Sequence, residues 1–244
     1  MKNTWTVFKR ELNSYFATPV AYVFLVVYLI LSGYFTWYLG RYYSTGQADL
    51  QVFFGFHPWL YLALIPAISM RLWAEERRGG TIEWLLTMPL SMGHAVAGKF
   101  LAAWAFTAVA LALTFTEWWT VGYLGDPDNG VILASYLGSL LMAGGFLAIG
   151  SCISALTKNQ VIAFVLSLAA CLLFILSGFP GVIDFVGAIA PEIVVDAVRS
   201  FSFLTHFNGI TRGVIEVRDL LFFSSLIAFF LYANAVIVDL KKAD

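Results

Sequence analysis

Charged side chains are scarce in this sequence. Asp, Glu, Lys and Arg together make up 12% of the 244 residues, whereas they make up about a quarter of a typical soluble domain. Hydrophobic residues make up 60% of the chain, and its mean hydropathy is +0.82. This balance excludes an ordinary water-soluble domain and indicates a chain that lies mostly in lipid.

Residues that bind metals or form disulfides are also few. The two cysteines, Cys152 and Cys171, both fall inside long apolar runs, which predicts buried packing residues rather than a disulfide or a metal pair. The three histidines lie in separate segments without the spacing of metal ligands. We therefore expect no cofactor bound by this chain, and a membrane-embedded enzyme is disfavoured. No basic patch suggests nucleic acid as a partner.

Six apolar runs reach the roughly 20 residues that a helix needs to cross a bilayer core. They lie near residues 20–39, 57–73, 100–122, 131–155, 161–179 and 220–238. Runs of this length do not all fit inside one water-soluble core. The sequence therefore predicts an all-α membrane protein in which residues 1–244 form a single transmembrane domain with six transmembrane helices.

Two segments outside these runs have a helical periodicity of their own. In residues 1–18, apolar side chains from Trp5 to Phe16 recur at spacings of three and four, which is typical of an amphipathic helix in the membrane interface. A frayed tail with chance periodicity is the alternative. In the outer segment 180–219, apolar residues at helical spacing are interrupted by Pro191. That pattern predicts two short interfacial or re-entrant helices at the outer surface, and a re-entrant pair would tuck against the fifth and sixth spans.

Lysine and arginine are distributed unevenly between the two sides of such a bundle. If both termini are cytoplasmic, ten of them lie on the inner side and four on the outer side. The positive-inside rule favours this arrangement. Six spans also return the chain to the side on which it starts.

The densest cluster of charge lies between the second and third runs, at residues 75–78. Two glycines then break the helix, and the Thr81 hydroxyl is suited to cap a new one. An apolar face and Pro89 at its end predict a short helix at about residues 80–91 across the cytoplasmic mouth. This helix is either a contact site through which a soluble, force-generating partner moves the bundle or an ordinary amphipathic loop helix that stabilises the topology.

One short motif imitates a nucleotide site. Residues 93–99 read GHAVAGK, which matches the start of the P-loop pattern G-x-x-x-x-G-K-[ST]. The last position is Phe100, which has no hydroxyl to hold magnesium, and no strand precedes the loop. Lys99 is instead expected to anchor the third span by extending its side chain to the headgroups. The chain thus lacks its own nucleotide site.

Within the apolar runs, Glu117 stands out as an ionisable residue, and such residues are functional candidates by default. It is placed to line an outer pathway, to pair with Arg41 or Arg212, or simply to reach the headgroups. The fourth run is rich in Gly, Ala and Ser at spacings that let helices approach closely. Contact inside the bundle is the simpler interpretation of these small residues, and a sliding face or dimer seam is the alternative.

The run from Glu75 to Ala102 resembles the inner loop of ABC-2 type permeases. In that family an acidic/basic pair is followed by G-T-[IL]-E-x-L-L, then by P-[LV]-S and by G-K-[FY] at the entry to the third span. This chain has EERRGGTIEWLLTMPLS and GKF in that order. The six-span layout, the N-terminal helix and the long outer segment are similar too. The segment from Ser202 to Asp219 looks like the subgroup related to the gliding-motility permease GldF.

The resemblance implies a permease subunit of an ATP-driven ABC-2 exporter in the bacterial inner membrane, not an enzyme in itself. A second permease, identical or related, would complete the pathway, and a separate cytoplasmic ATPase would bind ATP and magnesium. The 80–91 helix would then be the coupling helix. Its expected ATPase contacts are Glu75, Glu76, Arg77, Arg78 and Glu83, with Thr81, Ile82, Trp84, Leu85 and Leu86 filling the groove of the ATPase. The alternative is a membrane anchor that passes mechanical work to periplasmic or membrane accessory proteins without a translocated substrate.

Overall fold

The computed structural model describes residues 2–80 and 91–241. Within these residues the regular secondary structure is helical and there is no strand. The predicted all-α membrane protein is therefore confirmed. The predicted coupling helix at residues 80–91 lies almost entirely outside the described residues.

In the described part of the chain, five helical segments are long and apolar enough to cross a bilayer. The first, Pro19–Ser44, joins α2 (Pro19–Gly33), the π-helix η1 (Tyr34–Leu39) and α3 (Tyr42–Thr45). The second, Gln51–Gly79, joins α4 (Gln51–Ser69) and α5 (Arg71–Gly79), and the third, Met92–Leu124, joins α7 (Met92–Leu113) and α8 (Phe115–Leu124). The others are α9 (Asn129–Leu156) and α14 (Val217–Leu240). A sixth arises if α10 (Gln160–Leu176) and α11 (Pro180–Gly187), bent by 72°, form one broken span.

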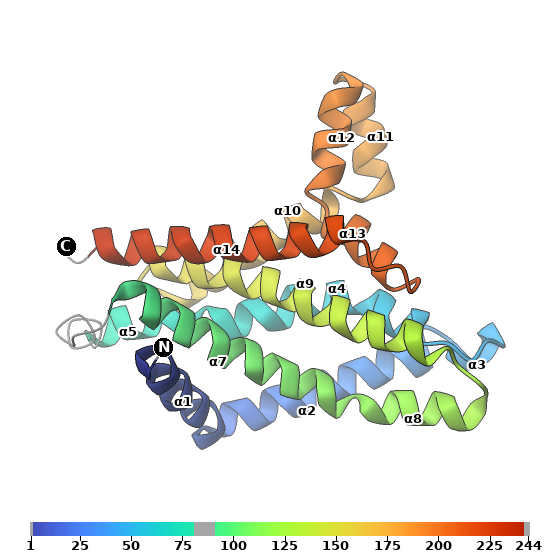
Figure 1. Cartoon of the computed structure of the whole chain (residues 1–244), viewed down its shortest axis with the longest axis horizontal. Coiled ribbons are helices and arrows are strands. Elements are labelled where there is room, and N and C mark those ends of the chain that lie inside the picture. The colour runs from blue at the N-terminus through green and yellow to red at the C-terminus, as the bar shows by residue number, and fades with distance from the viewer. Residues whose placement is uncertain (1, 81–90, 242–244) are drawn as a thin grey trace.

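Helix α9 is the central helix of the bundle and packs against α4, α7, α10 and α14 (Figure 1). Its small residues make these contacts possible. A Cβ atom added at Gly150 would lie 2.0 Å from the Ser69 hydroxyl of α4, and one at Gly138 would lie 2.7 Å from Ile210. The small residues of the fourth run therefore serve contacts inside the bundle, as the simpler interpretation holds.

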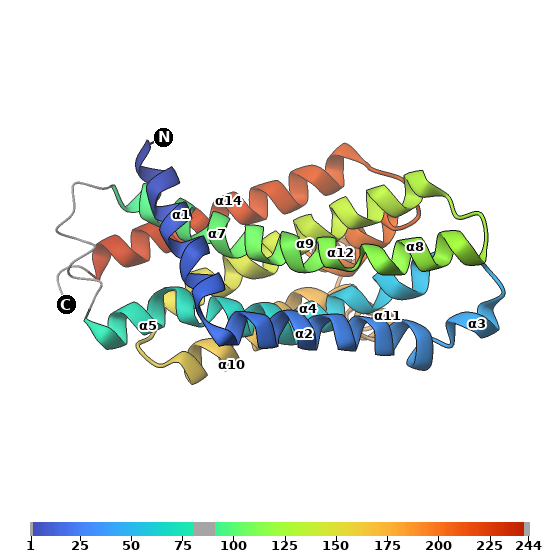
Figure 2. The ribbon, with the colours of Figure 1, turned by 90° about the horizontal axis from the view of Figure 1, so that it is seen from below.

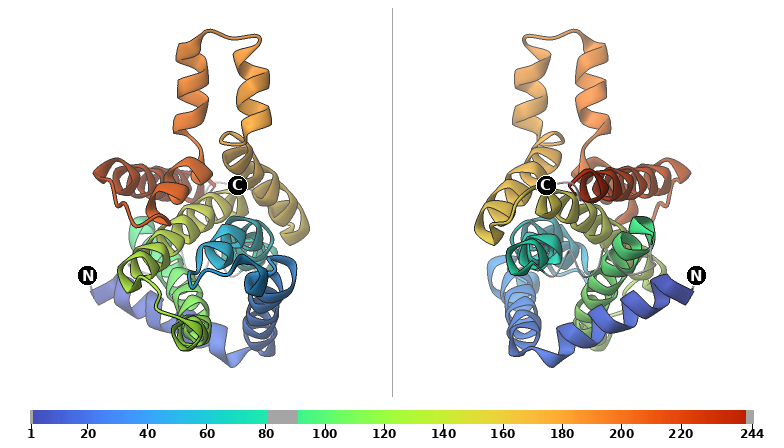
Figure 3. Two further views of the ribbon diagram at one scale, coloured as in Figure 1. Left: turned by 90° about the vertical axis from the view of Figure 1, so that its right-hand side faces the viewer. Right: turned by 90° about the vertical axis from the view of Figure 1, so that its left-hand side faces the viewer.

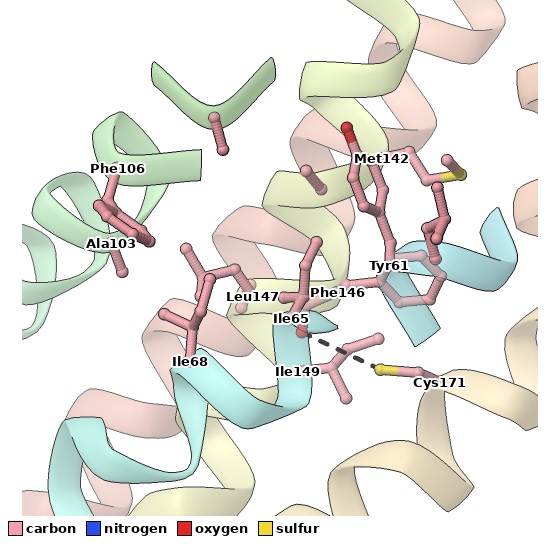
Figure 4. Close-up of a cluster of buried hydrophobic side chains, with 14 of the residues drawn as sticks. Tyr61, Ile65, Ile68, Ala103, Phe106, Met142, Phe146, Leu147, Ile149 and Cys171 are labelled. Carbon is pink, nitrogen blue, oxygen red and sulfur yellow. Dashed lines mark hydrogen bonds between the residues drawn. The ribbon is translucent and has the colours of Figure 1, made fainter. Parts of the chain in front are cut away.

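The hydrophobic core lies where α4, α7, α9 and α10 meet (Figure 4). Ile65, Phe106 and Phe146 are almost completely buried there. Cys171 is fully buried, and its thiol lies 4.0 Å from the carbonyl oxygen of Phe146. Both cysteines are free and buried, in line with the prediction that they pack rather than pair.

The N-terminal helix α1 (Lys2–Ala17) lies across α7 (Figure 2). The two helices approach closely at Gly98, where an added Cβ atom would lie 2.8 Å from the Val7 side chain. Because Gly98 has no side chain, the Val7 side chain of α1 can pack against the backbone of α7. The stretch predicted at residues 1–18 is a docked helix and not a frayed tail.

The outer segment contains the two predicted short helices and a third helix. Helices α11 and α12 (Glu192–Ser200) form a hairpin that projects away from the bundle (Figures 1 and 3), and neither has a buried side chain. Of the two alternatives, the re-entrant pair would tuck against the neighbouring spans, and α11 and α12 do not. The bundle contact is made instead by a third helix, α13 (Phe203–Ile210), against α9, α10 and α14.

Pro191 separates α11 from α12 as predicted. The base of the hairpin is fixed by His206 of α13. Its Nδ1 lies 2.6 Å from an Asp219 carboxylate oxygen of α14, and its Nε2 lies 3.1 Å from the carbonyl oxygen of Ser200. This buried pair holds the start of the last span to the end of the hairpin.

Candidate functional site

Several basic side chains gather at one end of the bundle, where α5, α9 and α14 end and α7 begins. There the Arg77 guanidinium donates a 2.8 Å hydrogen bond to the Ala155 carbonyl, and the Lys241 ammonium donates a 2.6 Å hydrogen bond to the Leu156 carbonyl. Both cations meet the last carbonyl groups of α9, where the helix dipole favours positive charge. We call this region the basic end.

Lys99 of α7 is the most deeply buried charge at the basic end. Its side chain is 2% exposed, and its Nζ lies 2.7 Å from Glu76 Oε1 of α5 and 3.3 Å from Glu11 Oε2 of α1. The ammonium also lies 5.4 Å from the centre of the Trp73 ring, within the range of a cation–π contact. Because a buried ammonium is costly unless it is paired, this geometry fixes three helices around one charge.

Glu11 experiences the effect of this pairing. Burial by itself raises the pKa of its carboxyl, but the nearby Lys99 ammonium and Arg10 guanidinium together lower it by more, so that the pKa lies below its ordinary value. Arg10 donates a 2.8 Å hydrogen bond to Glu11. Glu11 is therefore ionised at neutral pH and ties α1 to α7.

Ser154 of α9 joins the two halves of the second span. Helix α4 ends near Met70, where the chain turns into α5. The Ser154 hydroxyl donates to the Met70 carbonyl at 2.8 Å and accepts from the backbone N–H groups of Trp73 and Ala74 at 3.1 Å each. One hydroxyl thus replaces hydrogen bonds that the break removes, since buried backbone groups need partners.

The predicted ATPase-contact residues divide into three groups. Glu75 and Arg78 are exposed, and Glu75 forms a surface ion pair with Arg71 at 2.8 Å. Glu76 and Arg77 are partly buried and bind Lys99 and the end of α9. The remaining six lie outside the described residues: Thr81, Ile82, Glu83, Trp84, Leu85 and Leu86.

The prediction for Lys99 is wrong. Its side chain does not extend to the headgroups but is buried between α1, α5 and α7. Neither carboxylate partner is near Lys99 in the sequence. The signal available in the sequence is the neighbouring Gly98, since a glycine lets another helix approach closely.

Glu117 lies at the opposite end of the bundle, in the first turn of α8. It is 8% exposed, and its carboxylate accepts a hydrogen bond from the Trp37 indole of η1. In the described residues it forms no ion pair with Arg41 or Arg212. Its other oxygen, Oε2, is buried without a hydrogen-bond partner. The structure thus places Glu117 inside the bundle beside a π-helix, a form that often marks functional positions.

A second polar group, missed from the sequence, lies in the middle of the bundle. His57 Nδ1 lies 2.6 Å from the Ser139 hydroxyl, and the Tyr61 hydroxyl lies 2.7 Å from the same oxygen. All three side chains are almost completely buried. They come from α4 and α9, whose contact only the fold reveals. The cluster joins these two helices by direct hydrogen bonds between side chains.

Among the residues that the structure describes, five or six apolar spans form a helical bundle with a charged, interlocked end, which defines a multi-pass membrane protein. A family model described as ABC-2 family transporter protein matches residues 5–238, so the chain belongs to the ABC-2 family of transporter proteins. A search of curated proteins found no significant match. Membership makes the chain the membrane component of an ABC transporter, a class whose partner is in general an ABC ATPase.

Proposed function

We propose that this chain is the pathway-forming permease subunit of an ATP-driven ABC-2 exporter, coupled through residues 80–91 to a separate cytoplasmic ATPase. The ATPase holds ATP and magnesium, and this chain binds no cofactor. A second permease, identical or related, completes the pathway. The complex lies in the bacterial inner membrane with the basic end and both termini in the cytoplasm, and its subgroup is the GldF-like one.

The interlocked geometry of α5 is the observation that supports coupling. Helix α5 leads directly into residues 81–90 and is held to α7 and α1 through Glu76, Lys99 and Glu11. Arg77 and Ser154 hold it to α9. A displacement of the 80–91 segment therefore has to move these helices together rather than bend α5 alone.

Such an arrangement suits a rigid-body mechanism. In this mechanism, ATP binding closes two ATPase subunits and draws the coupling segments of two permeases together. Packed helices transmit this motion as a switch between two discrete states, because a close-packed core does not deform continuously. Glu75 and Arg78 are exposed and offer charges to the ATPase, while Glu76 and Arg77 connect the segment to the bundle. Glu117 remains the pathway candidate at the outer end.

A charge reversal in the coupling segment tests this proposal. We expect Glu83→Arg to abolish co-purification of the ATPase and ATP turnover by the complex, because it repels the cationic partner of Glu83 in the ATPase groove. Asp126→Arg is the matched control, since it makes the same kind of change at an exposed position in the turn between α8 and α9. Unchanged assembly and turnover in the Glu83 variant would remove the coupling role.

The second candidate is a membrane anchor that passes mechanical work to periplasmic partners. The α11–α12 hairpin favours it, because this hairpin projects from the bundle and exposes Phe185, Ile189 and Ile193. The structure of the assembled permease dimer distinguishes the two functions. A continuous polar path between the bundles supports transport, whereas a sealed apolar interface supports mechanical transmission.

A further inference from the structure

An apolar groove of about 750 Å³ opens on the side of the bundle at the junction of α1 and α7. This volume is in the range of roughly 300–1,000 Å³ that is common for small-ligand sites. Helix α1 contributes Trp5 and Phe8, whose rings stack at 5.0 Å. Helix α7 contributes Leu101, Trp104 and Ala108, and α9 contributes Leu140. The lining is almost entirely apolar.

Trp104 is one of two tryptophans in the wall, and its polar atom is already satisfied. The Trp104 indole donates a 2.9 Å hydrogen bond to the Leu140 carbonyl, so the surface that it presents to the groove is hydrocarbon. The groove extends from Leu101 to Ala108, about two helical turns or about 10 Å along α7. It is therefore a trough that runs parallel to a membrane-spanning helix and begins at α1.

A positive charge lies at the α1 end of this trough. The Lys9 ammonium is 5.2 Å from the centre of the Trp5 ring, and Trp5 lines the groove. Lys9 is exposed and has no acidic partner within ion-pair distance among the described residues. The neighbouring acidic residue, Glu11, is turned toward Lys99 and Arg10 instead. The rim is thus cationic and complements an anion.

The shape of the groove favours a lipid over a helix of a second protein chain. A spanning helix with its side chains is about 10–12 Å wide and straight. Helix α1 crosses α7 at one end of the trough (Figure 2). A straight helix laid along the trough would therefore collide with α1. An acyl chain is thin enough to lie in the trough, and the headgroup attached to it would lie beside α1.

We propose that this groove is a binding site for one anionic phospholipid of the surrounding bilayer, whose acyl chain lies along α7 and whose headgroup phosphate meets Lys9. The lipid fills the angle between α1 and α7 and so supports α1 where it crosses the third span. The site is independent of the ATPase and of any transported substrate.

Native mass spectrometry of the purified full-length chain tests this site. Delipidated protein is titrated with dioleoyl phosphatidylglycerol or with dioleoyl phosphatidylcholine, and bound lipid is counted. We expect one tightly held lipid and about a fivefold preference for the anionic one, the size expected of one basic residue near an anionic headgroup. Equal binding of the two lipids by the wild-type chain contradicts the proposal without the need for any variant.

Two variants test the contributions of the lipid headgroup and of the acyl chain to binding separately. Lys9→Gln should abolish the preference for phosphatidylglycerol while phosphatidylcholine binds as before, and Ala108→Trp should fill the trough and weaken the binding of both. The matched controls are Lys158→Gln, an exposed lysine in the turn between α9 and α10, and Ala169→Trp, at an exposed position on α10. Both should behave like the wild type. A tight lipid retained by Ala108→Trp, or a preference retained by Lys9→Gln, overturns the site.

Discussion

The Lys99 ammonium lies 2.7 Å from a Glu76 carboxylate oxygen, with only 2% of the lysine side chain exposed. Glu76 lies shortly before the segment that we propose to bind the ATPase, and Lys99 is in the first turns of the next spanning helix. The pair therefore connects the end of the second span to the start of the third. With Glu11, it joins three helices, α1, α5 and α7.

Removal of the buried ammonium should weaken the whole basic end. We expect Lys99→Met to lower the free energy of unfolding by up to about 3–5 kcal/mol, the range for breaking a buried ion pair. The partial exposure of both carboxylates moves the cost toward the low end of this range. Lys158→Met, at an exposed position, is the control and should change little. Thermal unfolding in detergent measures both.

A double-mutant cycle makes this prediction specific to the pair. Glu76→Gln, Lys99→Met and the double variant should be non-additive by about 0.5–3 kcal/mol, as is usual for residues in direct contact. Additive losses would show that the two side chains contribute independently and would contradict the interlocked geometry.

The attachment of α1 should depend on pH in one direction. Because the pKa of Glu11 is lower in the folded protein than its ordinary value of 4.5, its contribution to stability is complete above that value. It is lost as the pH falls through the lower, folded pKa. We expect a loss of thermal stability between about pH 5 and pH 3 that is smaller in Glu11→Gln. Identical pH profiles for the two proteins would show that Glu11 does not hold α1.

The hydroxyl of Ser154 should contribute more to the free energy of unfolding than the size of this group suggests. Ser154→Ala leaves the backbone N–H groups of Trp73 and Ala74 without this acceptor, and each buried unsatisfied group costs about 1–3 kcal/mol. Ser225→Ala is the control, because the exposed Ser225 donates only within its own helix. The difference in unfolding free energy between the two variants gives the contribution of the α4–α5 junction.

The stability of the protein should depend more on the size and polarity of the side chain at Glu117 than on its charge. Glu117→Gln keeps an oxygen that accepts from the Trp37 indole, so it should retain stability, whereas Glu117→Ala leaves that indole N–H unpaired at a cost of about 1–3 kcal/mol. Intrinsic fluorescence and thermal unfolding follow both. Equal stability of the alanine variant and the wild type would contradict the Glu117–Trp37 contact.

The sequence was informative about periodicity and composition and uninformative about tertiary pairing. Apolar runs near 131–155 and 220–238 predict helices that the structure places at Asn129–Leu156 and Val217–Leu240, because hydrophobic length is a local property. The partners of Lys99 were missed, since Glu11 and Glu76 reach it only through the crossing of α1 and the direction of α5. Such pairings depend on how helices pack, which one sequence does not encode locally.

The outer segment shows the same limit. Its apolar spacing and Pro191 predict helices on either side of the proline, and α11 and α12 are found there. Spacing does not say which neighbour an apolar face meets. The bundle contact is made by α13, whose Phe203 and Phe207 are almost completely buried.

Site-specific photo-cross-linking tests whether the segment after α5 binds the ATPase. A photoreactive residue is placed at position 83 in the native membrane complex, and a second variant carries it at position 126 in the turn between α8 and α9. We expect position 83 to cross-link to a P-loop ATPase, identified by mass spectrometry of the product, and position 126 not to do so. An ATPase captured from position 126 rather than 83, or from neither, would contradict the coupling of this permease through the segment after α5.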